Sequence, residues 1–413
     1  MFDSDFLNQP KADLMPGHVV GILGDGQLAY FLTAAAQDMG AQVFLLPPGK
    51  GESFAHSIAN RPAKEAEELN QVAALCSWLA IENEGQALEL GEALDPNNQQ
   101  KMRPSLDALK ILADKGLQKD FLTRRNLPTP RYQTFVASAD NSGSWLLAMG
   151  QFFPEGFVLK WTQGGYDGRG VQICRTAAAA LAKHNLLVDF IAEAVGRGAS
   201  VYAEECIEFD IEMALVTTRG EQGQLAFYPL VLTEQQHGVC RFVRGPATAW
   251  GWDKSFERQA QDIAAEIGAA MQIVGTFALE FFARHDGTFL INEIAPRVHN
   301  SGHFSLSACP SSQFENHWRA IAGLKLGETE VKTCFAMVNI LGHGSYHGPA
   351  AVPKLNSATS KVFWYEKCEM RPGRKMGHIN LLGASPNKLE IEIELIQRDL
   401  ETWSGELHGQ GQN

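Results

Sequence analysis

The sequence predicts an α/β protein of two or three domains, and three features of the chain support that fold class. The first is a β-α-β pattern at the start, with a strand over residues 18–23, a helix over 27–39 and a strand over 42–46. The second is a middle region in which strands and helices alternate, and the third is a strand-rich stretch from about residue 331. At 413 residues, the chain is long enough for each domain to bury its own core.

Apolar spacing extends this assignment along the chain. Helices are predicted over residues 63–79, 105–125, 177–184 and 253–271. Strands are predicted over residues 157–161, 171–175, 201–205, 212–218, 336–341, 361–365 and 378–382. The polar tail over residues 406–413 is rich in glycine and glutamine, so we expect it to fray.

Composition and charge narrow the range of partners. A formal net charge of −12 argues against nucleic acid as the default partner. The seven cysteines are scattered and form no CxxC pair, which favours a reducing compartment over a disulfide framework or a zinc site. No apolar segment approaches the ~18 residues of a membrane span, and the N-terminus has no apolar signal-peptide core. We therefore expect a cytoplasmic protein that binds neither nucleic acid nor a membrane.

A predicted hairpin places two carboxylates opposite each other. Apolar runs over residues 276–283 and 288–291 flank Asp286-Gly287, a pair typical of a two-residue hairpin turn. In that register Glu280 faces Glu293, and two like charges on one sheet surface destabilise the hairpin. A divalent cation between them removes the repulsion, because Mg²⁺ binds carboxylate oxygens. The alternative is that both glutamates point into solvent.

Two segments carry features of anion-binding sites. The turn Gly24-Asp25-Gly26-Gln27-Leu28-Ala29 matches G-x-G-x-x-A, but a dinucleotide site also needs an acidic residue where this chain has Leu45-Leu46-Pro47. The turn therefore suggests a general anion site at a helix N-terminus, with a plain strand–helix turn as the alternative. RPGRKMGH at residues 371–378 holds three cations, which suit a phosphate or a carboxylate, or else form a solvated turn.

A glycine-rich loop joins two of the predicted strands. Residues 164–170 contain four glycines, and Lys160 lies near the end of the preceding strand. The loop is not a Walker A motif, because it lacks the GK[ST] ending and leads into a strand. A strand–loop–strand unit suits a mobile flap whose N–H groups close over phosphates, with Lys160 reaching an α- or β-phosphate. A flexible surface hairpin is the alternative.

Other polar residues could complete a nucleotide site. Glu204-Glu205-Cys206-Ile207 can offer backbone groups and a carboxylate to an adenine, or can form an ordinary edge strand. Glu212 lies among apolar neighbours and needs a partner, such as a ribose hydroxyl or an arginine. Arg297, His299 and Asn300 follow the hairpin, where they can hold an anion beside the metal.

Together these segments resemble the ATP-grasp superfamily and, within it, the N5-carboxyaminoimidazole ribonucleotide synthetase family. The most specific matches are GGYDGRG at 164–170, NEIAPRVHNSGH at 292–303 and RPGRKMGH at 371–378. The other matches, all in family order, are GILGDGQL at 21–28, PSLDALKILADKGLQKDFLTRRNLPTP at 104–130, FALEFF at 277–282 and SQFENHWRAIAGLKLG at 312–327. They cover most of the chain beyond its N-terminal segment.

The resemblance implies an ATP-grasp fold and an ATP- and bicarbonate-dependent ligase. We expect a doubly wound, Rossmann-like pre-ATP-grasp domain at residues 1–113, an ATP-grasp domain at 114–330 and a small C-terminal domain at 331–413. A mobile lobe is expected at about 155–205. In the implied reaction of de novo purine biosynthesis, ATP phosphorylates bicarbonate to carboxyphosphate. Carboxyphosphate then carboxylates the exocyclic amine of 5-aminoimidazole ribonucleotide (AIR).

The resemblance also implies roles for individual residues. The metal, Mg²⁺ with Mn²⁺ as the alternative ion, would be bound by Glu280 and Glu293. The catalytic groups would be Arg297, His299, Asn300 and Lys375. ATP would be bound by Lys115, Lys160, Gly165, Tyr166, Asp167, Gly168, Arg169, Gly170, Glu204, Glu205, Cys206, Ile207, Glu212, Asn292 and Glu293. AIR would be bound by Gly26, Gln27, Glu84, Tyr166, Asp167, Arg297, His299, Asn300, Ser301, Arg374 and Lys375.

The chain departs from the family pattern at several positions. Ala29-Tyr30 follow the glycine turn, where the family commonly has Gly-Arg, and Trp161-Thr162-Gln163 stand where it often has basic residues. Lys115 replaces a common ATP-contacting arginine, which keeps the charge but loses the bidentate geometry. Residues 81–84 match the family's acidic signature only loosely, and the role of Glu84 depends on that match.

Three alternatives to this function stay open at this point. One is a related ATP-grasp ligase that passes another acyl phosphate to a nucleotide amine, such as a formate-dependent transformylase. Another is a nucleotide-binding homologue without turnover, and the third is a nicotinamide dehydrogenase, which the missing ribose acid opposes. The resemblance further implies a homodimer and a separate mutase enzyme that receives the product.

Overall fold

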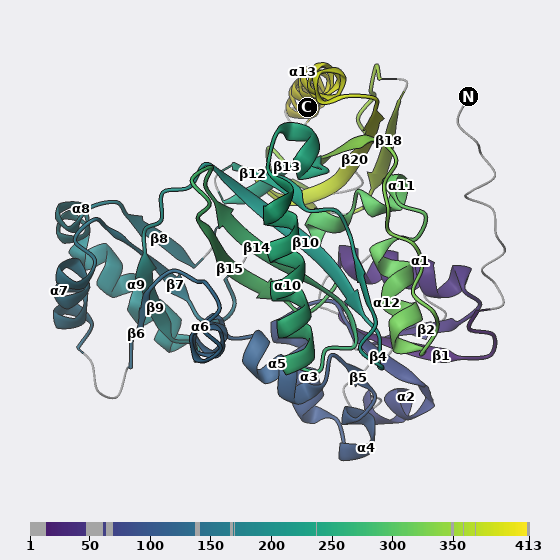
Figure 1. Cartoon of the computed structure of the whole chain (residues 1–413), viewed down its shortest axis with the longest axis horizontal. Coiled ribbons are helices and arrows are strands. Elements are labelled where there is room, and N and C mark those ends of the chain that lie inside the picture. Colours follow the sequence, from purple (N-terminus) through teal and green to yellow (C-terminus); the bar gives the residue numbers. More distant parts are fainter. Residues whose placement is uncertain are drawn as a thin grey trace.

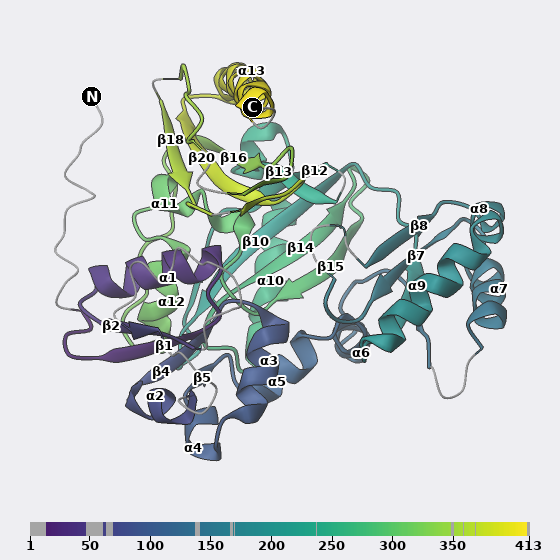
Figure 2. The ribbon, with the colours of Figure 1, turned by 180° about the vertical axis from the view of Figure 1, so that it is seen from behind.

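The chain folds into three connected lobes, shown in Figure 1 and from behind in Figure 2. One lobe holds a five-stranded sheet, the outer lobe holds a four-stranded sheet, and the central lobe holds a nine-stranded sheet. The structure is a computed structural model that describes residues 14–46, 61–62, 69–136, 141–165, 168, 170–236, 238–347, 351–357, 359–367 and 369–410.

The N-terminal lobe is a doubly wound parallel sheet in the order β3-β2-β1-β4-β5. Its strands are β1 (Val19–Leu23), β2 (Gln42–Leu46), β3 (Arg61–Pro62), β4 (Trp78–Ile81) and β5 (Met102–Arg103). Its helices are α1 (Gln27–Asp38), α2 (Leu69–Leu75), α3 (Glu84–Ala93), α4 (Pro96–Gln99) and α5 (Leu106–Leu112). The chain changes winding direction at β1, so the carboxyl ends of β1 and β4 form the switch point where such folds bind ligands.

The sequence prediction holds for the first β-α-β unit and is partly wrong for the helix that follows. The predicted strand over 42–46 and helix from Gln27 are both confirmed. The predicted helix over 63–79 is wrong at its end, because residues 78 and 79 begin β4. Leu79, Ala80 and Ile81 are fully buried, and an apolar run of this kind cannot be assigned to helix or strand from periodicity alone.

The predicted helix over residues 105–125 is two helices, α5 and α6 (Lys115–Arg124). Asp114 separates them in an extended conformation, and its Oδ1 accepts a 2.9 Å hydrogen bond from the Leu117 N–H. The N–H of Lys115 donates to the carbonyl of Thr162 at 2.8 Å. The break therefore fixes the first turn of α6 against the end of strand β7, and Lys115 stands at that junction.

The outer lobe is an antiparallel sheet in the order β6-β9-β7-β8 with three helices on one face (Figure 1). Its strands are β6 (Tyr132–Thr134), β7 (Phe157–Trp161), β8 (Val171–Cys174) and β9 (Val201–Glu205), and its helices are α7 (Ser142–Phe152), α8 (Ala177–Ala182) and α9 (His184–Gly196). Phe157, Leu159 and Trp161 belong to the core under these helices. Lys160 alternates with them along β7, so it points to the other face, toward the central lobe.

The central sheet follows the order β15-β14-β10-β12-β13-β16-β20-β18, with β11 beside β10. Its strands are β10 (Ile211–Arg219), β11 (Leu225–Phe227), β12 (Val231–Gln236), β13 (Val239–Gly245), β14 (Gly275–Ala283), β15 (Phe289–Ala295), β16 (Cys334–Leu341), β18 (Ser360–Trp364) and β20 (Lys375–Gly383). A separate two-stranded ribbon pairs β17 (Tyr346–His347) with β19 (Glu369–Met370). The strands after residue 331 therefore extend the sheet of the preceding region.

Four helices accompany the central sheet: α10 (Lys254–Ala270), α11 (Ser305–Ala308), α12 (Gln313–Ile321) and α13 (Pro386–Gln410). Helix α10 shares a core with β14 and β15, which fixes one face of that hairpin. Helix α12 joins the central and N-terminal lobes, and Trp318 Nε1 donates to the carbonyl of Leu32 at 2.8 Å. Residues 406–410 continue the backbone of α13, and their expected fraying stays a prediction.

The β14–β15 hairpin has a longer loop than the sequence predicts. Its loop is the three residues 285–287, and the N–H of Arg284 donates to the carbonyl of Thr288 at 2.9 Å. Gly287 has φ 97°, the left-handed conformation that three-residue hairpin loops place at their last position. The predicted two-residue turn is therefore wrong, and this loop by itself would set Glu280 opposite Asn292.

A β-bulge at Asn292 restores the predicted pairing of Glu280 with Glu293. The bulge adds one residue to β15, and the side-chain alternation of the strand shifts with it. Ile291 and Ile294 both lie in the core shared with α10, so the two residues between them face the opposite side of the sheet. Asn292 and Glu293 are thus presented together, although they are neighbours in sequence.

The cap at Asp114 gives a first prediction. Asp114→Ala should lower the free energy of unfolding by about 1 kcal/mol, because α6 loses the side-chain acceptor of its first turn. Asp262→Ala is the matched control, since Asp262 is an exposed carboxylate inside α10 and alanine is a better helix former. Urea unfolding of the wild type and both variants measures these changes. Equal unfolding midpoints for Asp114→Ala and the wild type would contradict the capping role.

Candidate active site

Glu280 and Glu293 face each other on the side of the central sheet that is turned away from α10. Burial, together with the nearby Glu293 carboxylate, raises the pKa of Glu280 to about 8. Burial would also raise the pKa of Glu293, but the ammonium of Lys115 outweighs it and holds that pKa below its usual value. Lys115 Nζ donates to Glu293 Oε2 at 2.7 Å. Lys115 thus pairs directly with Glu293, while Lys115 and Lys375 both oppose the raised pKa of Glu280.

This carboxylate pair has the chemistry of a magnesium site that a polyphosphate completes. Mg²⁺ in nucleotide enzymes takes one or two carboxylates and fills its remaining positions with phosphate oxygens and water. Among the described residues, no group of three or more His, Cys, Asp or Glu side chains could hold a metal ion alone. Glu280 and Glu293 fit Mg²⁺ because its charge would relieve the repulsion that raises the pKa of Glu280.

A buried cluster of three charges lies where the outer lobe meets the central lobe. Lys160 of β7 forms a close ion pair with Glu204 of β9, and its Nζ donates to Asn292 Oδ1 at 2.9 Å. Lys119 of α6 forms a second ion pair with Glu204 at 3.0 Å. Burial would raise the pKa of Glu204, but the two ammonium groups outweigh it and lower that pKa to about 2. The Glu204 carboxylate thus forms ion pairs with two lysines.

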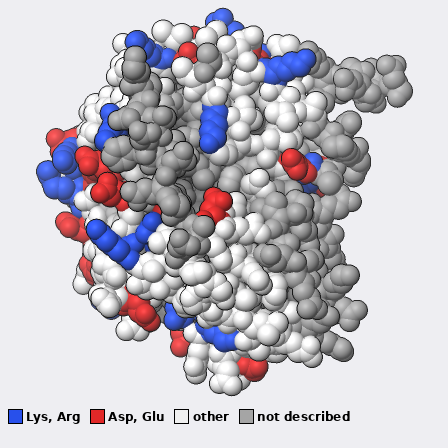
Figure 3. All heavy atoms as spheres, turned by 90° about the vertical axis from the view of Figure 1, so that its right-hand side faces the viewer, with Lys and Arg blue, Asp and Glu red and all other residues white. Residues whose placement is uncertain are grey.

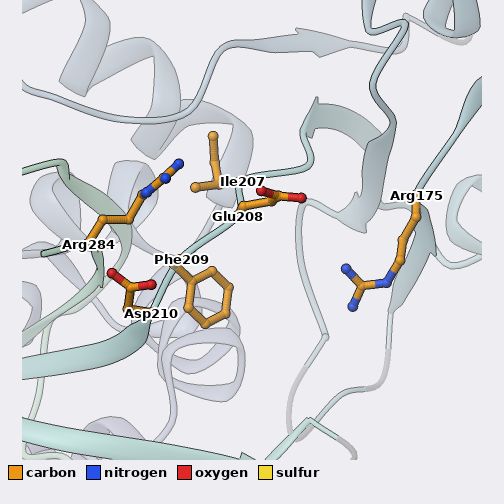
Figure 4. Close-up of a pocket in the computed structure, with 6 residues that line it drawn as sticks. All are labelled: Arg175, Ile207, Glu208, Phe209, Asp210 and Arg284. Atoms are coloured by element: carbon orange, nitrogen blue, oxygen red, sulfur yellow. The ribbon is translucent and has the colours of Figure 1, made fainter. Parts of the chain in front are cut away.

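The segment over residues 204–207 is predicted to bind an adenine, and most of its polar groups already have hydrogen-bond partners. Glu205 points outward and accepts two 3.0 Å hydrogen bonds from Arg131. The N–H groups of Glu205 and Cys206 donate to the carbonyls of Arg131 and Gly156. Ile207 lies at the edge of a pocket of about 370 Å³ lined by Arg175, Ile207, Glu208, Phe209, Asp210 and Arg284. Figure 4 shows Arg175 across this pocket from the other five.

Glu212 and Phe282 extend the same sheet face beyond the carboxylate pair. They are direct partners on β10 and β14, and Glu280 shares their face two residues along β14. Burial raises the pKa of Glu212, and Lys160 and Gln235 oppose that shift. The ring of Phe282 stacks on Phe209 with centroids 4.7 Å apart. A flat apolar surface therefore lies next to a partly buried acid, as a nucleoside requires.

The predicted glycine flap joins the paired strands β7 and β8. Gly168 and Gly170 have φ 78° and 73°, and Gly165 precedes them. A side chain at Gly170 would approach the Trp161 ring to about 3.0 Å, so close packing and backbone conformation both require glycine there. Three members of the predicted flap site lie outside the described residues, namely Tyr166, Asp167 and Arg169.

The loop after β15 brings His299 to the carboxylate pair. Its Nε2 is 3.6 Å from Glu280 Oε1, and its Nδ1 accepts from the N–H of Ser301 at 3.3 Å. Burial, with Arg297 and Lys375 nearby, lowers the pKa of His299 to about 3, so the ring is neutral and Nε2 carries the proton. Asn300 is buried and exchanges two side-chain hydrogen bonds with Asn339 of β16.

Arg297 reaches the switch point of the N-terminal sheet, where it forms a 2.9 Å ion pair with Glu84 at the start of α3. Glu82 follows β4 and lies against the glycine turn, because a Cβ at Gly26 would be 2.4 Å from its Oε1. This close approach explains why position 26 needs glycine. Gln27 accepts a 3.0 Å hydrogen bond from Lys367, whose Nζ also donates to the carbonyl of Lys375.

The basic cluster over residues 371–378 divides between the site and the surface ribbon. Lys375 begins β20 and lies close enough to affect the pKa values of His299 and Glu280. Arg374 instead donates to the Glu369 carbonyl at 2.7 Å. On the described part of the face in Figure 3, charged side chains of both signs lie in small groups among uncharged ones.

Three polar residues of the site were missed by sequence analysis: Glu82, Lys119 and Lys367. Glu82 belongs to the loosely matching acidic segment, and the role predicted there was given to Glu84. Lys119 lies on α6, where a lysine in a helix usually indicates an exposed position. Lys367 lies outside every motif. The positions of Lys119 and Lys367 depend on contacts between segments far apart in the sequence, which no local pattern reports.

The fold and the site define an ATP-grasp protein. Residues 120–314 match the family model of the ATP-grasp domain, and residues 336–392 match that of the phosphoribosylaminoimidazole carboxylase C-terminal domain. In the described part of the chain, no helix combines the length and apolar character needed to cross a membrane. The predicted fold class, an α/β ATP-grasp fold with doubly wound N-terminal sheet, is confirmed.

Comparison with known proteins identifies the family within this class. The N5-carboxyaminoimidazole ribonucleotide synthase of Synechococcus elongatus is 36% identical over 395 residues, which cover 94% of this chain and 95% of the relative. The synthetase structure from Thermotoga maritima has a TM-score of 0.75 at 30% identity and covers 93% of this chain and 98% of its own. The chain belongs to the N5-carboxyaminoimidazole ribonucleotide synthase family.

A third comparison concerns ligands. The N5-carboxyaminoimidazole synthase of Aspergillus clavatus, solved in complex with ADP and 5-aminoimidazole ribonucleotide, has a TM-score of 0.76 at 26% identity. The match covers 92% of this chain and 98% of that one. The predicted family is confirmed in sequence by the Synechococcus elongatus relative and in fold by the Thermotoga maritima structure.

The pKa of Glu280 predicts how stability depends on pH when nucleotide and Mg²⁺ are absent. Glutamate titrates near 4.5 in the unfolded chain, whereas Glu280 titrates near 8 in the folded protein. Between these values the folded protein keeps a proton that the unfolded chain releases, so stability falls as the pH rises from 4.5 through about 8. Glu280→Gln should remove this contribution.

Thermal unfolding at several pH values in this window measures the effect. The midpoint of the wild type should fall more steeply with rising pH than the midpoint of Glu280→Gln. Glu401→Gln is the control, because Glu401 is an exposed carboxylate on α13. Parallel profiles for wild type and Glu280→Gln would show that Glu280 does not carry the proton.

Proposed function

We propose that this chain catalyses the ATP- and bicarbonate-dependent carboxylation of AIR to N5-carboxyaminoimidazole ribonucleotide. The observation that carries the proposal is the meeting of Glu280, Glu293, Lys115 and Lys160 on one sheet face beside His299, in a chain of this family. Carboxylates, cations and a neutral histidine provide what phosphoryl transfer to bicarbonate requires, which is mainly positioning and charge stabilisation.

We assign the nucleotide to the cleft between the outer lobe and the central sheet. The base would lie against Phe282 and the segment ending at Ile207, with the Glu212 carboxylate available to a ribose hydroxyl. Lys115 and Lys160 would hold phosphate oxygens, and the glycine flap would cover them and exclude water from the acyl phosphate. Bound Mg²⁺ would neutralise charge on the transferred phosphoryl group, held by Glu280 and Glu293.

AIR and bicarbonate would bind where the three lobes converge. The glycine turn at Gly26 and Gln27 offers N–H groups to the AIR phosphate, supported by the N-terminal end of α1. Arg297 and Lys375 would flank the carboxyphosphate, with His299 between them and the metal pair. Ser301 would hold His299 in place through its hydrogen bonds to Nδ1, and Asn300, fixed by Asn339, would face the same substrates. Arg374 and Glu84 would complete the AIR site from the two outer edges.

The remaining assignments rest on the family resemblance. We propose a homodimer, a cytoplasmic location and a separate mutase that takes up the product. We also propose domain limits at residues 113 and 330, with a lobe over about 155–205 that moves over the nucleotide. A nucleotide-binding homologue without turnover is the second candidate function, because Ala29-Tyr30 replace the common Gly-Arg after the glycine turn and Lys115 replaces a common ATP-contacting arginine.

Release of ADP tests the proposed reaction. Purified protein with Mg-ATP should release ADP rapidly only when bicarbonate and AIR are both present. ATP binding without that stimulation would favour another acceptor or a homologue without turnover. The related ligase is tested in the same assay with formate in place of bicarbonate and another nucleotide amine in place of AIR.

Glu293→Gln gives a prediction for the metal pair. Turnover should fall by about a hundredfold or more, since one ligand charge is lost where charge develops in the transition state. The fold should survive, because the substitution also removes the repulsion between the facing carboxylates. Glu266→Gln, at an exposed position on α10, is the control. Near-normal turnover in Glu293→Gln would refute the assignment of Glu293 to the metal.

A further inference from the structure

The charged cluster of Lys119, Lys160 and Glu204 is unusual because it is buried and unbalanced. The side chains of Lys119 and Glu204 are each 2% exposed, and that of Lys160 is 12% exposed. Two ammonium groups face one carboxylate, so these three side chains sum to a charge of +1, and the acids Glu212 and Glu293 also act on Lys160. A buried net charge is costly unless another group or a ligand neutralises it.

Lys119 is held away from the nucleotide cleft by its own contacts. Its Nζ donates to Thr129 Oγ1 at 2.7 Å, and this hydroxyl donates to the carbonyl of Ile291 at 2.9 Å. Ile291 immediately precedes the bulge residue Asn292, which accepts from Lys160. Lys119 therefore lies behind Glu204, while Lys160 lies toward the cleft, and only Lys160 is partly exposed.

The relative positions of Lys119, Glu204 and Lys160 determine how much positive charge Lys160 presents to an anion in the cleft. With Glu204 alone, Lys160 would form a closed, neutral ion pair and have little attraction left for an anion. Lys119 balances the Glu204 carboxylate from behind. The excess positive charge then belongs to the side of the cluster that faces the cleft.

We propose that Lys119 is a positioning residue that balances Glu204 and so leaves Lys160 with a net positive charge for the nucleotide phosphates. The inference rests on the proposed function, because it takes the cleft as the nucleotide site. It assigns no contact between Lys119 and the nucleotide. If Lys119 only supported the fold of α6, its replacement would weaken the binding of every ligand of the cleft to the same extent.

The test compares charge states of the cluster by calorimetric binding of ADP and of adenosine. Lys119→Met keeps a long, unbranched side chain and reduces the cluster charge from +1 to zero. ADP affinity should fall by roughly tenfold or more, while adenosine affinity stays near that of the wild type. The double variant Lys119→Met/Glu204→Gln restores a charge of +1 on Lys160. Its ADP affinity should return to within about threefold of the wild type.

Lys110→Met is the matched control, since Lys110 is a half-exposed lysine of the neighbouring helix α5. Equal ADP affinity in Lys119→Met and wild type would overturn the inference, as would equal losses for ADP and adenosine. If Lys119→Met does not fold, the double variant decides, and a tenfold loss of ADP affinity there overturns the inference. A wild type that binds no ADP would instead overturn the proposed function itself.

Discussion

The architecture depends on one constraint, the placement of two carboxylates on facing positions of β14 and β15. Glu280 and Glu293 repel each other, and partial burial strengthens the effect, so the hairpin needs positive charge at this point. Lys115 supplies part of it from the first turn of α6, whose direction is set by the break at Asp114. The core shared with α10 holds the other side of the hairpin and prevents the two side chains from turning away.

The other lobes are arranged around that pair. The outer lobe contributes Lys160, which reaches Asn292 beside the pair, and the bulge presents Asn292 and Glu293 together. The loop after β15 sets His299 next to Glu280 and sends Arg297 to the switch point of the N-terminal sheet. Lys367 connects the C-terminal strands to Gln27 at the same switch point. Segments from three sheets thus converge at one place, which is why the family motifs are spread along the whole chain.

Sequence reasoning predicted the fold class and the carboxylate pair, but it reached the pair through a turn that does not form. The true loop is one residue longer than Asp286-Gly287, and the bulge at Asn292 compensates for that residue. The pairing was predictable because carboxylate spacing and hairpin signals are local. The break at Asp114 and the burial of Lys119 were not, because each depends on strands that are distant in sequence. A lysine on a helix carries no signal that a glutamate of another lobe will cover it.

The two charged groups of the site are unbalanced in opposite directions. At Glu280 and Glu293 two acidic side chains face each other, and Lys115 pairs with Glu293 while Glu280 keeps its proton up to about pH 8. At Glu204 two lysines pair with one carboxylate. The two groups act on each other, because Lys160 lowers the pKa of Glu293 and Glu293 in turn acts on Lys119. Burial still makes an excess of either charge costly at this point. A ligand that carries a divalent cation at one end and phosphate oxygens at the other satisfies both at once. Mg-ATP, the nucleotide of the proposed reaction, has that charge arrangement, so the facing acids and the lysine cluster would both contribute to its affinity and orientation.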